Sequence, residues 1–243
     1  MAPAPSSAAS APKRFWTQAA CRPAEGGAGW AVRLDGKPLR TPGGAELLAP
    51  TQALGEATAA EWNAQGERLD PATLPLTKAL NTVIDRVTTH HAEVVGMIAE
   101  YGGSDLICYR APHPRPLAER QAEAWDPWLA WAETRHGARL TCAEGVMHVA
   151  QPAEALAALT AAVAAHDPHR LAALHELVTL SGSLVLGLAV SEGALGAEDG
   201  WRLSRLDEDF QAEHWGEDAE AAEVAALKRR DFLQARRLLD LLA

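Results

Sequence analysis

Apolar residues recur with a period of two near the N-terminal end of the chain and with a helical period beyond about residue 70. Trp30, Val32 and Leu34 alternate with small or charged residues, and an Asp-Gly pair follows them. Alternation of this kind is typical of a strand with one buried face, and Asp-Gly is typical of a tight hairpin turn. The pattern predicts a strand at 30–34 that turns into a second strand around Leu39.

Two further elements complete this antiparallel region. Phe15 to Gln18 predicts an earlier strand, and a helix over roughly 52–65 is expected to close the region. Beyond these, apolar residues such as Leu76, Leu80 and Val83 are spaced by three and four, as on one face of an amphipathic helix. Longer helices are expected near 116–136, 152–166, 168–192 and 197–240.

Two details qualify the helical forecast. Asp126-Pro127 lies inside the 116–136 segment, and a proline there is expected to kink the helix or divide it in two. Pro168 follows Asp167, and proline is well suited to a first helical turn. A short extended piece, ARLTCAEGV, is expected before the 152–166 helix.

The fold class that follows is α+β, with a small antiparallel β-rich N-terminal domain and a larger all-helical C-terminal domain. Residues 1–13 are rich in Ala, Pro and Ser and are expected to form a disordered tail. The β-rich domain is expected over 14–70 and the helical domain over 71–243.

Composition and charge exclude several classes of partner. Of 243 residues, 48% are hydrophobic, which is enough for a sizeable core, and the net charge is −10. A nucleic-acid partner requires a cationic surface, so none is expected. Ten acidic residues and two arginines lie between Glu198 and Glu223, a local charge of −8. This stretch is either a solubilising face or a surface that attracts a basic partner.

No motif for a cofactor, a metal or a membrane span stands out. The three cysteines form no CxxC pair, which favours small buried thiols in a reducing compartment. His90 and His91 are adjacent, so on a helix they point about 100° apart and cannot share one metal ion. Neither of the glycine-rich nucleotide-binding motifs occurs, and no apolar run reaches the roughly 18 residues of a membrane helix.

The stretch SRLDEDFQAEHWGED, residues 204–218, is the strongest candidate for a functional site. On a continuous helix of about 100° per residue, Glu208, Gln211 and Trp215 lie within about 60° of one another. Leu203, Leu206 and Phe210 lie on the opposite side and form the natural core stripe. A large aromatic on the polar side of a helix suggests coverage by another domain or by a partner.

Three interpretations of this stretch compete. It can be a solvated face on which the tryptophan is incidental, or a protein-binding stripe formed by Glu208, Gln211 and Trp215. It can also be a metal or acid/base site, because residues 213, 214, 217 and 218 are acids and a histidine at helical spacing. A metal- or acid-dependent hydrolase is therefore the alternative function.

Four blocks of sequence resemble the F1-ATP synthase assembly chaperone family. They are LPLTKALNTVIDRV (74–87), GGSDLICYR (102–110), AERQAEAWDPWLAWAETRHG (118–137) and LSRLDEDFQAEHWG (203–216). The blocks occur in the family's order, and the similarity spans about residues 15–235. The segment VRLDGKPLRTP also resembles the family's β region.

The resemblance implies a chaperone that is not an enzyme and that needs no cofactor. It would bind the unassembled α subunit of F1 and shield the surface destined for the β subunit. In the family the last block holds an acidic residue needed for function, and Glu208 matches it by position, with Asp207 and Asp209 on either side. The expected location is the bacterial cytoplasm, or the mitochondrial matrix in a eukaryote.

Overall fold

The computed structural model describes residues 12–27 and 29–243. The chain folds into two compact units, one of residues up to 86 together with 241–243, the other of residues 87–240. The boundary expected near residue 70 lies within the first unit. Most of the expected tail lies outside the described residues; at its end, Lys13 pairs with Arg68 in an isolated β-bridge.

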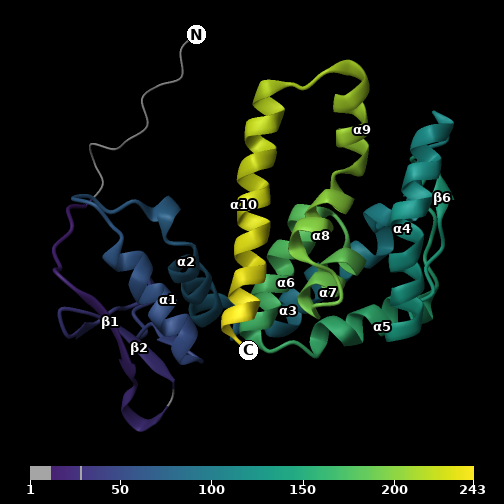
Figure 1. Ribbon diagram of the computed structural model, residues 1–243. Helices are drawn as coiled ribbons and strands as arrows, with labels where there is room; N and C mark the ends of the chain where they lie inside the picture. The colour runs from purple at the N-terminus through teal and green to yellow at the C-terminus, as the bar shows by residue number, and fades with distance from the viewer. Residues whose placement is uncertain (1–11, 28) are drawn as a thin grey trace. The chain divides into compact units, whose positions relative to one another are not determined.

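The first unit contains a small antiparallel sheet (Figure 1). Its strands are β1 (Ala19–Pro23), β2 (Trp30–Leu34), β3 (Lys37–Pro38) and β4 (Leu48–Ala49). Strand β2 pairs with all three others. Asp35 and Gly36 connect β2 to β3 with φ angles of 47° and 83°. Positive φ at both positions is what a two-residue hairpin turn needs, so the predicted hairpin is confirmed.

The strand expected at 15–18 is wrong, because the first strand of the sheet is β1. The backbone N–H groups of Thr17 and Gln18 donate to the side-chain carboxylate of Asp35, at 2.9 and 2.8 Å. These donors are therefore not available to a neighbouring strand. The indole of Trp16 is buried and lies edge-on to the ring of Trp62, with 4.9 Å between centroids.

Helix α1 (Gln52–Asn63) packs closely on the sheet, as the predicted 52–65 helix requires. A Cβ on Gly55 would lie 2.5 Å from the Sγ of Cys21, so only glycine permits this approach. Trp62 Nε1 donates to Thr77 Oγ1 at 2.9 Å and joins α1 to α2 (Pro75–Thr82). Short helical turns are η1 (Glu25–Gly27), η2 (Pro71–Thr73) and the π-helical turn η3 (Val83–Val87).

The second unit is helical. Its first elements are α3 (His91–Ala99), η4 (Glu100–Ser104), η5 (Leu106–Cys108), β5 (Tyr109–Arg110), α4 (Arg115–His136) and β6 (Ala143–Glu144). The remaining helices are α5 (Ala153–Ala164), α6 (Pro168–Ser181), α7 (Leu184–Ser191), α8 (Ala197–Ser204), α9 (Leu206–Trp215) and α10 (Ala219–Leu241). Strands β5 and β6 form a short parallel pair, which contains part of the expected extended piece. The class of fold is α+β, as predicted.

Helix α7 lies at the centre of this unit, and all eight of its residues are buried. The predicted single helix over 168–192 is wrong, since it divides into α6 and α7. Gly182 ends α6 with a φ of 71°, and the Ser183 hydroxyl caps α7 by accepting from the N–H of Leu186 at 3.0 Å. The α6 start is as predicted, because Pro168 is its first residue and Asp167 accepts from the N–H groups of residues 169 and 170.

Of the two other long predicted helices, one is divided and one is continuous. The segment 197–240 contains three helices, because the backbone leaves the helical path at Arg205 (φ −108°, ψ 9°) and at Gly216 (φ 93°). The helix predicted over 116–136 is present as α4, and Pro127 within it does not divide it in two. Trp125 and Ala132 are buried on either side of the proline, and their packing outweighs the missing hydrogen bond.

The cysteines are free, but they are not uniformly buried. Cys108 is buried, Cys21 is half-buried and Cys142 is exposed, so the expectation of buried thiols is wrong for Cys142. Cys142 directly precedes the two-residue strand β6, which pairs with β5. Within residues 12–27 and 29–243, no helix has both the length and the apolar character needed to cross a bilayer.

Candidate partner-binding surface

The stretch 204–218 divides into three parts. Ser204 ends α8 and is buried, with its hydroxyl donating to the carbonyl of Trp201 at 2.7 Å. Helix α9 then starts anew after Arg205 and ends at Trp215, before Gly216. The continuous helix assumed from the sequence is therefore wrong at Ser204, whereas residues 206–215 share one helical frame.

One side of α9 is anchored on α4. Leu206 and Phe210 are the buried residues of the helix. The guanidinium of Arg120, from α4, lies 5.3 Å from the centre of the Phe210 ring, and the imidazole of His214 stacks on the same ring with 4.1 Å between centroids. The predicted core stripe of Leu206 and Phe210 is confirmed, while Leu203 belongs to α8 and is half-buried.

A buried amide links α9 to α4 and to β5. Gln121 is 1% exposed, and its Nε2 donates to Asp207 Oδ1 at 2.7 Å. Its Oε1 accepts from the N–H of Ala111, and its backbone carbonyl accepts from Arg110, each at 2.7 Å. Both polar groups of the side chain therefore have a partner, which offsets the cost of burying them. The bond from Gln121 also gives Asp207 a structural role.

Trp125, one turn further along α4, donates from Nε1 to the carbonyl of Leu203 at 3.0 Å. Sequence reasoning did not single out Arg120 or Gln121. For Gln121 the sequence did hold a signal. It is spaced by four residues from Trp125, which places both side chains on one face of α4. What they would contact could not be predicted from that spacing.

Glu213 is held by an ion pair. Arg120 Nη1 lies 2.9 and 3.0 Å from the two carboxylate oxygens of Glu213. This hydrogen bond lowers the pKa of Glu213 and raises the pKa of Arg120. Partial burial raises the pKa of Asp209, and the positive charge of Arg205 acts to lower it. Glu213 and Asp209 thus belong to the flank of α9 that approaches Arg120.

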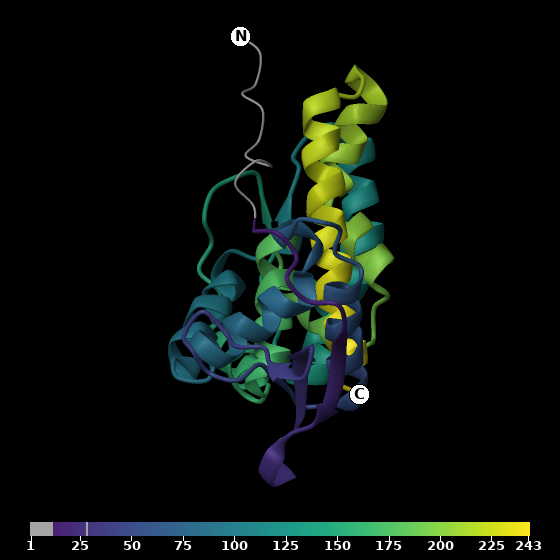
Figure 2. The same cartoon turned by 90° about the vertical axis from the view of Figure 1, so that its left-hand side faces the viewer.

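The outer face of α9, formed by Glu208, Gln211 and Trp215, is exposed. Trp215 is 76% exposed and the Glu208 side chain 48% exposed, so the orientation predicted from the helical period is confirmed. Arg205 Nη1 donates to Glu208 Oε1 at 2.7 Å. Figure 1 shows α9 between α4 and the N-terminal half of α10, and Figure 2 shows α10 in front of α9, in agreement. The side of α9 opposite this outer face is the one anchored on α4.

The four residues considered for a metal site do not converge. Glu213 binds Arg120, and the Nδ1 of His214 lies 2.8 Å from the carbonyl of Phe210. Asp218 accepts from the N–H of Glu220 at 2.9 Å at the start of α10. Across the described part of the chain, no three His, Cys, Asp or Glu residues are grouped so that they could hold a metal ion.

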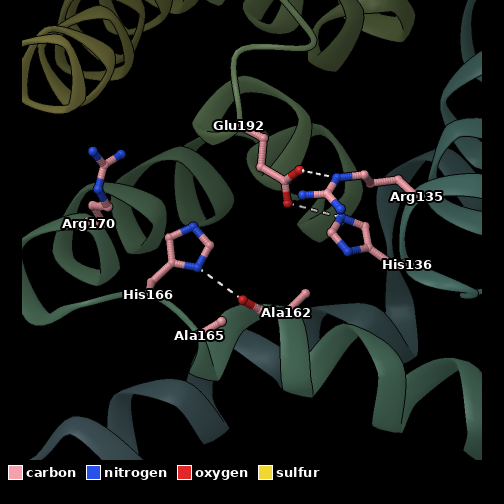
Figure 3. A pocket seen from close by; sticks show the side chains of 7 residues that line it. All are labelled: Arg135, His136, Ala162, Ala165, His166, Arg170 and Glu192. Atoms are coloured by element: carbon pink, nitrogen blue, oxygen red, sulfur yellow. Dashed lines mark hydrogen bonds and ion pairs between the residues drawn. The ribbon is translucent and has the colours of Figure 1, made fainter. Parts of the chain in front are cut away.

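A pocket of about 370 Å³ lies elsewhere in the helical unit (Figure 3). It is lined by Arg135, His136, Ala162, Ala165, His166, Arg170 and Glu192. Glu192 already bonds Arg135 at 2.8 Å, and its other oxygen lies 3.2 Å from His136. Burial lowers the pKa of His136, and the charge of Glu192 acts in the opposite direction. The pocket contains no residue of 204–218, so the acidic stretch and the hollow do not form one site.

Comparison with known proteins defines the class to which this fold belongs. A family model described as ATP12 chaperone protein matches residues 13–133, which places the chain among protein chaperones. Two crystal structures of Atp12 from Paracoccus denitrificans, one of them a point mutant, are each 45% identical to it with a TM-score of 0.91. They cover 95% of this chain and 98% of their own. The chain belongs to the ATP12 chaperone family.

Two further relatives agree. A structure from Agrobacterium tumefaciens is 43% identical with a TM-score of 0.91, covering 96% of this chain and 87% of that chain. The mitochondrial atp12 protein of Schizosaccharomyces pombe is 24% identical over 229 residues, or 87% of this chain and 76% of that protein. Membership of this family indicates a chaperone role in ATP synthase assembly.

Proposed function

We propose that this protein binds the unassembled α subunit of F1-ATP synthase and shields its β-facing interface until the β subunit takes its place. It does so without catalysing a reaction. An α subunit without its neighbours exposes a large apolar surface, and such surfaces aggregate. The proposed place of action is the cytoplasm of a bacterium or the matrix of a mitochondrion, in keeping with the bacterial and mitochondrial relatives.

The observation that carries the proposal is the outer face of α9. Trp215 is a large aromatic held in solvent by a helix whose other side is anchored on α4. Tryptophan is enriched among the residues that dominate binding energy at protein interfaces. A few anchors surrounded by polar groups give a contact that is specific but releasable, as a chaperone requires.

Among the three neighbouring acids, Glu208 is the best candidate for recognition of the client. Asp207 is bonded by the buried Gln121, and Asp209 lies on the flank near Arg120. Glu208 is on the outer face, where its ion-pair partner Arg205 is also partly exposed. Ion pairs open to solvent contribute little to stability, so a basic group of the client can replace Arg205 at small cost.

The test is binding of purified, unassembled α subunit to Glu208→Lys. Loss of a charge contact at an interface anchor weakens binding by about tenfold or more. The thermal midpoint of the chaperone should stay the same, since the Glu208 side chain is half-exposed. Binding is measured by co-purification, and protection of α is measured by light scattering.

Glu123→Lys is the matched control. Glu123 is exposed and lies about 200° around α4 from Gln121, so the same reversal of charge falls on a face remote from α9. Equal loss of binding in both variants would show a general effect of charge. Failure of the unaltered protein to bind α at micromolar concentration would remove the proposed function itself.

A further inference from the structure

Two cysteines lie beside each other where β5 and β6 pair. The register of this parallel pair places Tyr109 opposite Ala143. Cys108 directly precedes Tyr109 and Cys142 directly precedes Ala143, so the same register brings the two cysteines opposite each other. Neighbouring strands lie about 4.8 Å apart, and the Cα atoms of a disulfide are usually about 4.4–6.8 Å apart. The spacing of the two strands is therefore within the range that a disulfide requires.

Both thiols lie on the same side of the strand pair. Tyr109 is extended, with φ −105° and ψ 124°, so the side chains of Cys108 and Arg110 on either side of it point the same way. Arg110 Nη2 lies 3.8 Å from the Sγ of Cys142. Burial raises the pKa of the Cys108 thiol, and the charges of Asp105 and Cys142 raise it further. The two sulfur atoms therefore share one environment beside the Arg110 guanidinium.

The segment that contains Cys142 is held in place on both sides of that residue. Gln151 is 9% exposed; its Oε1 accepts from the N–H of Thr141 at 2.7 Å, and its Nε2 donates to the Thr141 carbonyl at 2.9 Å. The N–H of Gly145 donates to the carbonyl of Arg110 at 2.8 Å. These bonds fix the backbone of Cys142 beside β5.

The two thiols differ in their access to solvent. Cys142 is exposed, whereas Cys108 is 1% exposed. An exposed thiolate can attack a dissolved disulfide, and a buried thiol can only react with a group that is brought to it. An accessible cysteine next to a second one is the arrangement of an attacking thiol and a resolving thiol.

We propose that Cys108 and Cys142 form a reversible disulfide when the protein meets a low-molecular-weight disulfide. The Cys142 thiolate attacks one sulfur of that compound, whose S–S bond breaks. A mixed disulfide forms on Cys142, and the first thiol leaves with the proton that Cys142 lost. Cys108 then attacks Cys142 Sγ and displaces the second thiol, which takes the Cys108 proton. The two cysteines are oxidised, and the small disulfide is reduced to two thiols.

The surroundings set the conditions under which this happens. In a reducing compartment both cysteines stay thiols, and the disulfide forms only on oxidation. Burial disfavours the thiolate of Cys108, so the second step is the slower one and takes minutes to hours without a catalyst. This site is separate from the outer face of α9 and does not depend on the proposed function.

The first experiment maps the product by mass spectrometry. The reduced protein is incubated with glutathione disulfide, its remaining thiols are blocked with iodoacetamide, and it is digested with trypsin without reductant. The expected product joins peptide 87–110 to peptide 140–170, which contain Cys108 and Cys142. The same product should form to the same extent in Cys21→Ala, the matched control, because Cys21 belongs to the other unit.

Two further variants test the order of the steps. Cys108→Ala should stop at the glutathione mixed disulfide on Cys142, and Cys142→Ala should leave Cys108 unmodified. Circular dichroism checks that each variant is folded. In the unaltered, reduced protein, iodoacetamide should alkylate Cys142 at least about tenfold faster than Cys108. Alkylation of Cys142 before oxidation should abolish the linked peptides.

Three outcomes would overturn the proposal. The unaltered protein can stop at the mixed disulfide, as Cys108→Ala is expected to do, which would show that the thiols do not reach each other. The linked peptide can contain Cys21, or two chains can be joined through Cys142. None of these measurements involves the α subunit, so their failure leaves the proposed function as it stands, and failure to bind α leaves the disulfide as it stands.

Discussion

Helix α7 and the segment of residues 206–227, here called the arm, place their apolar residues in opposite surroundings. All eight residues of α7 are buried, whereas in the arm only Leu206 and Phe210 are buried, and Trp215 projects into solvent. Burial of apolar side chains is the main source of folding free energy, so α7 contributes to stability far more than the arm does. The arm keeps apolar surface exposed, which costs solubility and is useful only if a partner covers it.

The carboxylate that holds the start of α7 and the carboxylates of the arm differ in the same way. Asp105 is fully buried and accepts from the N–H of Val185 at 2.9 Å and of Ile107 at 3.2 Å, which fixes the start of α7. Burial raises its pKa to about 6. The acids of the arm are mostly exposed, and the pKa of Glu213 is lowered by Arg120 instead. Aspartate in the core holds backbone groups, while acids in the arm present charge.

Apart from the Trp125→Ala control given below, the largest expected effect is that of Asp105→Ala. The variant leaves the buried N–H groups of Val185 and Ile107 without an acceptor, which should lower the free energy of unfolding by about 3 kcal/mol at about pH 5. Urea denaturation followed by circular dichroism measures it. Asp105→Asn, which retains one acceptor, should lose less. A loss below about 1 kcal/mol would contradict the contrast between the two regions.

The pH dependence of stability tests the same residue without removing its contacts. The folded-state pKa of Asp105 lies above its ordinary value of 3.8, so the folded protein holds this proton more tightly than the unfolded chain. The stabilisation is complete below about pH 4 and is lost as the pH rises through about 6. Relative to Asp105→Asn, the free energy of unfolding should fall by about 3 kcal/mol between about pH 4 and 8. A difference that rises with pH would show that the sign is wrong.

Trp215→Ala should have the smallest effect on stability, because its side chain is exposed. The free energy of unfolding should change by no more than about 0.5 kcal/mol, while affinity for unassembled α falls by about tenfold or more. Trp125→Ala is the control, since that ring is 1% exposed and its loss should cost about 3–5 kcal/mol. If Trp215→Ala unfolds the protein, the arm is a structural element.

Much of the fold could be predicted from periodicity. The hairpin at Asp35-Gly36, the helix after residue 50 and the capped start of α6 follow from local rules that depend on neighbouring residues only. The predicted strand at 15–18 was wrong because the deciding contact is not local, whereas the single helices over 168–192 and 197–240 were wrong because the chain breaks locally, at residues such as Gly182 and Gly216. Asp35 binds the N–H groups of residues 17 and 18, and Ser183 starts a new helix after Gly182.

The candidate surface divides along the same line. The helical period by itself determined that Glu208, Gln211 and Trp215 share a face opposite Leu206 and Phe210, because side-chain direction on a helix depends only on position. Only the tertiary structure decided which of three adjacent acids is available, since Gln121 lies 86 positions from Asp207 along the chain. It also placed the N-terminal half of α10 beside α9 (Figures 1 and 2), because the length of a helix beyond its packing partner is not encoded in its own sequence.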